Sequence, residues 1–590
     1  MFESPRRCGN ILNAWSESLE ELQETQPVSP VSTDNPGKKR KKKKREQQRS
    51  FSVPQLFTAA SVASDPEERN RGDTDQRAET EEPIVRGIFQ IEKRSCDVVL
   101  TATRVIWTQI QPETPTAGDI KASETNQDEY VELKDIFAVK LKRRRSVGQQ
   151  TGGTLLGITL FQCVRKGKKL KDHAIHLSNL SVDHCEVWFK HLKDLLNGFR
   201  NRPKSLKVFV NPNSHKKEAH QIYKEQVEPL FKLADIKTDI TITENKGQAL
   251  SILKECKLDE YDGVVCVGGD GTASEVAYGL LLRAQMDAGR DTDSIFTPVR
   301  APLPLGIIPA GSTDVVACSV HGIRHPVTAA MHIIMGHLQS VDVCTFSSHS
   351  RLLRFGFSAM FGFGGRTLAL AEKHRWMPSN QRREFAVIKT LANLKPEDCE
   401  LSFLPLTQSQ KVTEGKSRND STKDSPPNTD DEEEWQKIKG LFLNISIMAI
   451  PCLCSMAPRG LAPNTRLDNG SMALIVVRNT SRADFIKHLK RYGSLKNQFS
   501  FSFVETYTVQ AVKVRPRPWS GWGDDTLEEN VEIDSKNTPM ISSEGSYPWN
   551  IDGDLMEASE VCIRVHPQLI TLFGVNTEEV DESTVKCSCI

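Results

Sequence analysis

The sequence predicts a multidomain protein of α/β and β class, in which a small β barrel precedes an α/β domain with a parallel sheet and a mostly antiparallel β domain. Short alternating apolar runs fill about 85–198, which is typical of consecutive antiparallel strands. After Pro203, strand-like runs alternate with helix-like runs, as in a parallel sheet with crossover helices. From about 340 onward the strand-like runs follow one another closely and helix-like runs become few.

These changes in pattern give the domain boundaries. We expect the barrel at 85–200, the α/β domain at 203–339 and the β-rich domain at 340–575. Two polar inserts in the last domain, 406–434 and 515–547, lack apolar periodicity and are predicted to be disordered.

Composition excludes several protein classes. The 590 residues are 38% hydrophobic and 26% charged, close to an ordinary soluble protein. No apolar run approaches the about 18 residues of a membrane-spanning helix, and the polar start of the chain has no hydrophobic signal core. We therefore expect neither secretion nor a membrane span. The 14 cysteines are scattered except for Cys452/Cys454 and Cys587/Cys589, so we expect reduced thiols and no metal site.

Both ends of the chain are expected to be disordered tails. Residues 1–84 are rich in Ser, Pro, Glu and Gln and include eight consecutive cations, Lys38, Lys39, Arg40, Lys41, Lys42, Lys43, Lys44 and Arg45. Such a run is compatible with nuclear import, nucleic-acid contact, anionic-lipid contact or a merely solvated tail. Residues 576–590 end in Cys587-Ser588-Cys589-Ile590, which loosely fits a prenylation box and otherwise is a free tail.

The predicted barrel ends in one amphipathic helix. Its apolar residues, from Cys185 through Trp188 and Leu192 to Leu196, recur at helical spacing. A strand barrel closed by one Trp-bearing helix resembles a pleckstrin-homology domain. That resemblance implies a basic face for phosphoinositides, and the candidates are Lys140, Lys142, Arg143, Arg144 and Arg145. The alternative is an exposed basic hairpin tip.

Two glycine-containing loops carry the sharpest chemical pattern. Gly268-Gly269-Asp270-Gly271-Thr272 follows a buried strand and opens a helix, and Pro309-Ala310-Gly311-Ser312-Thr313-Asp314 repeats that form. Glycines let backbone amides approach an anion, which a helix N-terminus also favours. Since both loops follow parallel strands, we expect them to converge where ligands bind in open α/β sheets.

At these residues the chain resembles the diacylglycerol, sphingosine and ceramide kinase superfamily. The match to ceramide kinases extends through APRGLAPNTRLDNGSM around Arg459 and through Trp549-Asn-Ile-Asp552-Gly553-Asp554. The resemblance implies a two-domain diacylglycerol-kinase-type fold with ATP in the cleft, bound by Asn211, Pro212 and the loop residues Gly268, Gly269, Gly271, Thr272, Gly311, Ser312 and Thr313. It also implies that Asp270 acts as general base on a lipid hydroxyl and that Asp552 and Asp554 help hold Mg²⁺ on the phosphates, with Gly553 between them in the nucleotide site.

The chain departs from ceramide kinases at the first phosphate loop and at the headgroup position. Residues 213–218 (Asn-Ser-His-Lys-Lys-Glu) stand where ceramide kinases carry a glycine-rich phosphate loop. Their side chains restrict the backbone conformations that point amides at an anion, so we expect a loss of several kcal/mol of phosphate stabilisation. Each loss of roughly 1.4 kcal/mol corresponds to a tenfold lower rate. Arg366 stands where the resemblance implies an acid that orients the lipid headgroup. It is predicted to grip a phosphate or carboxylate through its guanidinium fork, and Glu372 is a second substrate-binding candidate. The alternative is a surface arginine that begins a helix containing Glu372 and Arg375. Asp554 is shorter than the usual Glu, and Asn469 and Ala473 replace acids.

Three hypotheses follow. The first prediction is a ceramide kinase relative that lacks ceramide kinase activity and acts as a lipid- or protein-binding regulator, with ATP and Mg²⁺ binding in doubt. The second is an active lipid kinase for a lipid other than ceramide, and the third is a nucleic-acid role of the basic tail. We expect anionic or sphingoid lipids, membrane surfaces and proteins as partners, and a location in cytoplasm and nucleus with peripheral association to internal membranes.

Overall fold

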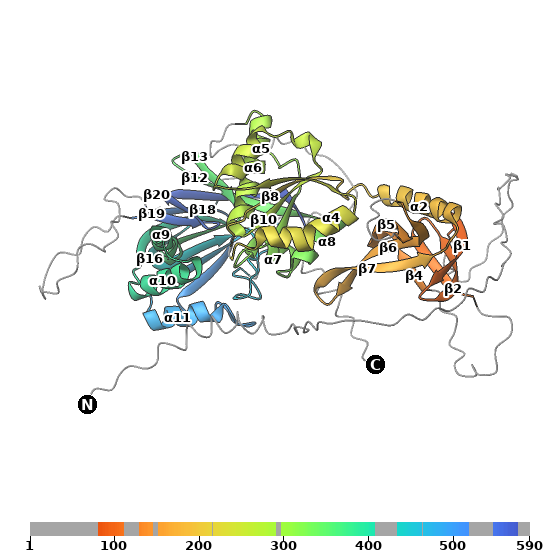
Figure 1. Cartoon of the computed structure of the whole chain (residues 1–590). Helices are drawn as coiled ribbons and strands as arrows, with labels where there is room; N and C mark the ends of the chain where they lie inside the picture. Colours follow the sequence, from red (N-terminus) through yellow and green to blue (C-terminus); the bar gives the residue numbers. More distant parts are fainter. Residues whose placement is uncertain are drawn as a thin grey trace, which may run out of the picture. The chain divides into compact units, whose positions relative to one another are not determined.

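The computed structural model describes residues 81–110, 129–144, 152–214, 216–290, 297–406, 434–462, 464–517 and 547–575 (Figure 1). All of them belong to one compact unit of the chain. Within these ranges, no helix combines the length and the apolar character that crossing a bilayer would require. The basic run Lys38–Arg45, Arg145 and the C-terminal cysteines lie outside the described residues.

The amino-terminal domain is an antiparallel seven-stranded sheet, among the described residues, that is closed by one helix. Its strand order is β4-β3-β2-β1-β7-β6-β5. The elements are β1 (Val85–Ile91), β2 (Arg94–Leu100), β3 (Arg104–Gln109), β4 (Glu129–Glu132), η1 (Leu133–Asp135), β5 (Ile136–Arg144), β6 (Thr154–Lys166), β7 (Lys169–Ser178) and α2 (Val182–Asn197).

Helix α2 packs on this sheet through the apolar face that the sequence predicts. The Ser181 hydroxyl caps the helix by accepting a hydrogen bond from the His184 amide at 3.4 Å. Trp188 is fully buried and meets Phe89 edge-on, with ring centroids 5.0 Å apart. Gly87 permits this approach, because a Cβ there would lie 2.3 Å from the His184 ring.

In the described part of the α/β domain, four parallel strands follow the order β11-β10-β8-β9. Helices α5 and α6 cover one face of this sheet, and α3, α4 and α8 cover the other. The elements are β8 (Ser205–Val210), α3 (Ala219–Ile222), η2 (Tyr223–Val227), α4 (Glu228–Leu233), β9 (Lys237–Ile242), α5 (Gln248–Glu255), η3 (Leu258–Glu260), β10 (Gly263–Gly268), α6 (Asp270–Asp287), β11 (Leu305–Pro309), α7 (Val315–His321) and α8 (Pro326–Met335). Strands β8, β10 and β11 are buried on both faces, which explains their mostly apolar runs, whereas the edge strand β9 is partly exposed.

The carboxy-terminal domain is mostly antiparallel. Its elements are β12 (Leu338–Ser348), β13 (Arg351–Gly356), β14 (Ser358–Gly362), α9 (Phe363–Lys373), α10 (Ser379–Ala392), β15 (Glu397–Pro405), β16 (Gln436–Met448), β17 (Met472–Arg478), α11 (Arg482–Arg491), β18 (Val504–Pro516), β19 (Tyr547–Ile551), β20 (Asp554–Ala558) and β21 (Val561–Phe573). Strand β21 pairs with β12 and β18 and also lies parallel to β11, so it joins this domain to the α/β sheet. Pairing of β18 continues to Pro516 and therefore enters the region predicted as an insert.

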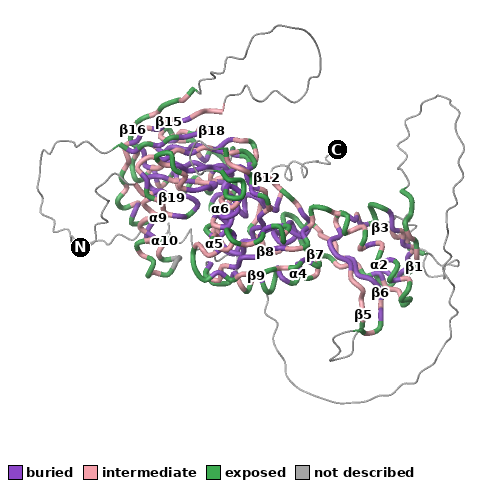
Figure 2. The backbone as a smooth tube through the Cα atoms, turned by 90° about the horizontal axis from the view of Figure 1, so that it is seen from above, coloured by how far each residue is buried: buried purple, intermediate pink, exposed green. Residues whose placement is uncertain are grey.

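The amino-terminal domain shares a hydrophobic cluster with the α/β domain. Phe137, Ala138 and Leu170 belong to the same buried cluster as residues of β8, α4 and α8. The Leu170 amide also donates to the Thr328 hydroxyl at 3.0 Å. The buried positions, purple in Figure 2, run through both sheets.

Candidate functional site

Three loops meet at the carboxyl ends of β8, β10 and β11. These strands are hydrogen-bonded neighbours and parallel, so their ends lie along one edge of the sheet. The Asn211 amide donates to the Val267 carbonyl at 3.0 Å, and the Ala310 amide donates to the Gly268 carbonyl at 2.9 Å. The Asn211 side chain donates to the Thr272 hydroxyl at 2.9 Å. The structure thus brings together the loop residues that the sequence predicts for a nucleotide site.

Two of the loop glycines are required by close packing. A Cβ on Gly311 would lie 2.4 Å from the Cα of Gly269, and a Cβ on Gly269 would lie 3.0 Å from the Cα of Gly311. The two loops therefore touch backbone to backbone. Gly271, in contrast, has nothing within 4 Å of a built Cβ. Glycine at 271 is consequently not explained by packing.

Asp270 opens α6 and reaches across to the start of α7. Its Oδ1 accepts a hydrogen bond from the Val316 amide at 3.1 Å. Burial raises the pKa of Asp270 to about 6, and repulsion by Asp314 adds to this effect. A carboxylate whose pKa is raised in this way is a better proton acceptor than an exposed aspartate. The predicted base is therefore in a suitable electrostatic setting.

The second loop is held by one arginine from the connection between α7 and α8 and by another from α10. Arg324 pairs with Asp314 at 2.6 Å, and the Asp314 Oδ1 accepts from the Gly311 amide at 2.9 Å. Arg383 of α10 donates to the Ser312 hydroxyl. Burial lowers the pKa of Arg383, while the nearby Asp270 opposes that shift. A guanidinium from the carboxy-terminal domain thus lies beside the predicted base.

Three backbone amides of the first loop, residues 211–217, donate hydrogen bonds within the loop itself. The Asn213 amide donates to the Asn211 side chain at 3.0 Å, the Ser214 amide to the Asn211 carbonyl at 3.2 Å, and the Lys217 amide to the Ser214 carbonyl at 2.8 Å. Lys217 has a φ of 66°, a conformation that glycine adopts without strain. His215 lies outside the described residues. Three amides are therefore turned into the loop and are not presented to an anion.

The carboxylate of Asp552 accepts four hydrogen bonds from other residues of the protein. Its Oδ2 accepts from the Phe357 amide at 2.8 Å and the Ser274 hydroxyl at 3.1 Å, and its Oδ1 accepts from the Ser358 amide at 2.8 Å and hydroxyl at 2.9 Å. Gly356 makes room for it, because a Cβ there would lie 2.5 Å from Oδ2. Burial nevertheless raises the pKa of Asp552. This carboxylate fastens α6 to strands β13 and β14.

Asp554 is paired with two cations. Its Oδ2 accepts from Arg354, and its Oδ1 accepts from Lys246. Arg354 also donates to the Ser274 hydroxyl at 2.9 Å. Arg354 and Asp554 are both buried, with 8% of each residue exposed. Gly553 takes a φ of 85° in the turn between the two aspartates.

The donor set does not fit Mg²⁺ in this arrangement. A divalent cation of this kind needs carboxylate oxygens that face it. The oxygens of Asp552 accept four hydrogen bonds, and both oxygens of Asp554 already face positive charges. Across the part of the chain that the structure describes, no group of three or more His, Cys, Asp or Glu residues is placed to hold a metal ion.

Comparison with known proteins gives the same family over all three domains. Family models match the ceramide kinase PH domain at residues 85–192, the diacylglycerol kinase catalytic domain at 205–346 and the ceramide kinase C-terminal domain at 357–590. The chain is 60% identical over 531 residues to the human ceramide kinase-like protein, covering 85% of this chain and 92% of that one. It is 36% identical over 541 residues to mouse ceramide kinase, covering 84% and 98%. The chain belongs to the ceramide kinase family.

The comparisons confirm the family and the fold class that the sequence predicts. The chain is also similar to Arabidopsis thaliana sphingosine kinase 2, to which it is 28% identical over 403 residues, covering 66% of this chain and 79% of that one. A diacylglycerol kinase structure from Bacillus anthracis str. Sterne is 14% identical, covers 64% of this chain and 98% of that chain, and gives a TM-score of 0.39.

Arg366 is the departure from ceramide kinases whose setting the structure explains. Arg366 lies on α9 and pairs with Glu397 of β15, and it also donates to the Lys395 carbonyl. Burial lowers the pKa of Arg366 and raises the pKa of Glu397. Glu372, further along α9, pairs with Arg375. The guanidinium of Arg366 is thus engaged within the protein, and its predicted contact with a headgroup stays a prediction.

The remaining departures lie in ordinary structural settings. The side-chain oxygen of Asn469 accepts from the Ser471 amide at 3.2 Å and hydroxyl at 2.9 Å, which makes a local turn. Ala473 lies in β17, paired with β16 and β18.

The cations of β5 in the PH domain differ in their partners. Lys140 pairs with Asp235 of the α/β domain at 2.5 Å, so it faces that domain. Arg143 donates to the Gly153 carbonyl at 3.4 Å. Lys142 and Arg144 belong to the same strand, and their lipid-binding role stays a prediction.

Sequence reasoning missed four basic residues at the site. Arg354 neutralises Asp554 from a distance of 200 residues in the chain, and Lys246, Arg324 and Arg383 come from yet other segments. One signal was available for Arg354. It stands inside the otherwise apolar run Leu352–Phe355, where a charged residue needs a buried partner.

Proposed function

We propose that this chain is a lipid-binding regulator of the ceramide kinase family that does not phosphorylate ceramide. The observation that carries the proposal is the pairing of Asp554 with Arg354 and Lys246. In kinases of this kind the acid would face a divalent cation on the phosphates, whereas here it faces two protein cations.

The first loop supports the same proposal. Phosphoryl transfer depends on positioning and on neutralising charge, so a site with an intact base is inactive when the phosphates are not held. The amides of Asn213, Ser214 and Lys217 are used inside the loop. ATP and Mg²⁺ are therefore not expected to bind tightly together.

Lipid binding is the function that the remaining features favour. The PH domain and the lipid kinase domains are both present. We expect peripheral contact with anionic or sphingoid lipids, and protein partners that respond to that contact.

A transfer assay tests the loss of activity. Purified full-length protein is incubated with ceramide in mixed micelles, labelled ATP and Mg²⁺, with mouse ceramide kinase as positive control. We expect no labelled lipid above background. A calorimetric titration with ATP should give no binding that depends on Mg²⁺. Ceramide phosphorylation that disappears in Asp270→Asn would contradict the proposal.

Lipid binding has its own assay. Vesicles containing ceramide, or an anionic phospholipid, are sedimented with the full chain and compared with neutral vesicles. We expect the chain to sediment with at least one of the first two and to remain in the supernatant with the third. Equal recovery in all three supernatants would refute lipid binding.

The second candidate is a kinase for a lipid other than ceramide. The raised pKa of Asp270 favours it, because such a group accepts a proton readily near neutral pH. A panel of lipid alcohols with labelled ATP tests it. Transfer that is lost in Asp270→Asn would establish this function, and the absence of any such transfer would remove it.

Localisation and nucleic-acid contact stay proposals about the basic tail. We propose that the chain is shared between cytoplasm and nucleus, with peripheral association to internal membranes. Substituting Lys38–Arg45 by alanines in a fluorescent fusion should reduce nuclear signal.

RNA binding by the run should fall steeply with salt, because the cations release condensed counterions. A flat salt response would exclude a phosphate contact.

A further inference from the structure

A second candidate site lies at the seam between the PH domain and the α/β domain. A cavity of about 480 Å³ is lined there by the PH domain, by the connecting segment Phe199–Arg202 and by the turn after α8. Arg165 comes from the end of β6, Arg200 from the connecting segment and His337 from the turn. None of these residues belongs to the cleft at Asp270.

The lining carries an excess of positive charge. Its cations are Lys134, Arg165, Arg200 and Arg202, and its one acid is Asp135. Burial, with Arg202 and Arg165 nearby, lowers the pKa of His337, so this ring is neutral at pH 7. Glu132, outside the lining, pairs with Lys134, which leaves three cations against one carboxylate. In a partly enclosed space this excess creates an attraction for anions.

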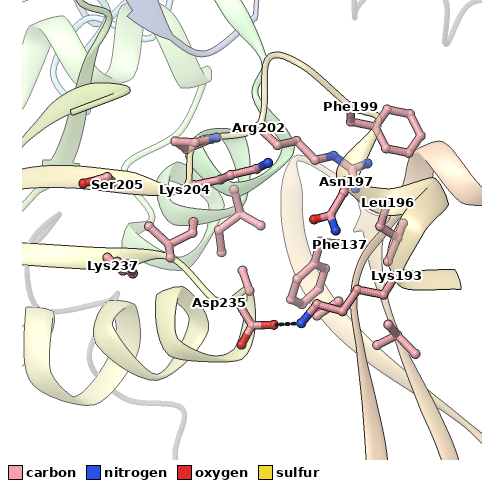
Figure 3. A pocket seen from close by; sticks show the side chains of 16 residues that line it. Phe137, Lys193, Leu196, Asn197, Phe199, Arg202, Lys204, Ser205, Asp235 and Lys237 are labelled. Carbon is pink, nitrogen blue, oxygen red and sulfur yellow. Dashed lines mark hydrogen bonds and ion pairs between the residues drawn. The ribbon is translucent and has the colours of Figure 1, made fainter. Parts of the chain in front are cut away.

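At a neighbouring cavity on the same seam, basic side chains are paired with an acid. This cavity, of about 390 Å³, shares Phe199 and Arg202 with the first. Figure 3 shows Lys193 and Asp235 meeting at its edge, and Asp235 also accepts from Lys140. Two of the basic side chains at this part of the seam are therefore matched by an acid.

In the larger cavity the two outer arginines are not matched. Among the described residues, neither Arg165 nor Arg200 forms an ion pair or side-chain hydrogen bond, whereas Lys134 pairs with Glu132. Arg202 is fixed differently, since its guanidinium donates to the Ile136 carbonyl at 2.6 Å and to the Lys134 carbonyl.

Capping of helix α8 does not explain these arginines. The carbonyls of His332 and Ile333 at the end of α8 already accept from the backbone amides of His337 and Gly336, each at 3.1 Å. These two carbonyls therefore need no guanidinium, and neither Arg165 nor Arg200 donates to the other described carbonyls at this helix end.

We propose that this cavity binds a phosphate-bearing anion, held by the guanidinium groups of Arg165 and Arg200 above a floor fixed by Arg202. Arginine presents paired N–H donors that match phosphate oxygens. The phosphate group belongs either to a lipid headgroup or to a free ion. Because its residues come from both domains and the segment between them, an occupant would link the PH domain to the α/β domain. The proposal does not depend on the activity at Asp270.

Titration calorimetry on the full chain tests this site with two probes, inorganic phosphate and monomeric dihexanoyl phosphatidic acid. Arg165→Gln with Arg200→Gln should weaken binding at least about tenfold, because two charges near the phosphate are lost. Arg290→Gln with Arg351→Gln removes the same charge from exposed positions outside the seam and should change affinity less than about twofold.

A third variant gives an effect of opposite sign. Asp135→Asn removes the lining acid and should tighten binding about three- to tenfold. Equal binding of both probes supports recognition of the phosphate alone, and binding of phosphatidic acid alone supports a lipid headgroup. The proposal is overturned if neither probe binds, or if affinity does not respond to the arginine pair or to Asp135. Thermal melts without probe check that each variant is folded, and Asp135→Asn remains decisive should the arginine pair unfold.

Discussion

Replacing Arg354 by methionine is expected to destabilise the carboxy-terminal domain by about 3–5 kcal/mol. Methionine keeps much of the stem volume but removes the positive charge. Asp554 would then retain Lys246 alone, whose side chain is 66% exposed and therefore forms a screened, weak pair. The Ser274 hydroxyl would also lose the hydrogen bond that it accepts at 2.9 Å. The main cost comes from a buried carboxylate left without its buried partner.

Urea unfolding followed by tryptophan fluorescence measures this change. Trp549 is fully buried in β19, next to the turn that carries Asp552 and Asp554, and reports on this region. The matched control is Arg351→Met on the same strand β13, where the side chain is exposed and less than about 0.5 kcal/mol is expected. The double variant Arg354→Met with Asp554→Leu should regain much of the lost stability, because it removes the unpaired charge.

The same variant also tests why Mg²⁺ does not fit. Once Arg354 is gone, one oxygen of Asp554 is free, so Mg²⁺ at ten times its dissociation constant should stabilise the variant by about 1.4 kcal/mol. The wild type should gain much less. Equal gains in both proteins, or an unchanged stability of Arg354→Met, would refute the reasoning about this ion pair.

Three further predictions concern the site. Asp270→Asn should raise the free energy of unfolding by about 1–3 kcal/mol above pH 6 and have no such effect near pH 3, below the pKa of an unfolded aspartate. The reason is that the raised pKa of about 6 makes the folded wild type lose stability as Asp270 ionises. A pH-independent difference in urea midpoints would contradict this. Arg366→Asp should destabilise the protein by about 3–5 kcal/mol, because residue 366 would then place a second acid beside Glu397. In thermal melts, the exchanged pair Arg366→Glu with Glu397→Arg should recover most of the lost stability, and full stability of the single variant would show that the pair is not needed. Gly311→Ala should lower the free energy of unfolding by about 2–4 kcal/mol, because its Cβ would overlap the facing loop, whereas Gly271→Ala should be neutral or stabilising by up to about 1 kcal/mol. Equal urea midpoints for the two variants would exclude the packing argument.

Local pattern predicted the parts of the site that depend on neighbours in sequence. Gly268–Thr272 and Gly311–Thr313 each follow a buried strand, and parallel strands end at the same edge, so their convergence follows from the pattern alone. The helix around Trp188 was predictable for a similar reason, because its spacing repeats within one segment.

Pairing across long stretches of chain was not predictable. Arg366 and Glu397 are 31 positions apart, and Arg354 and Asp554 are 200 apart, so no periodicity connects them. Its place in a basic cluster makes Lys140 a candidate for a lipid-facing surface, yet its partner is Asp235 in another domain. A charge run shows that cations are present, but only the folded chain decides which of them are neutralised.

The shared cluster around Phe137, Ala138 and Leu170 has a practical consequence for fragments of this protein. A truncated chain that starts near residue 203 would expose the apolar side of β8 and α8 to water and lose the bond from Leu170 to Thr328. Such a fragment would tend to aggregate, and its failure in an assay would report misfolding. Any shortened form of the chain that lacks the first domain should accordingly be poorly abundant, whatever chemistry its remaining sequence encodes.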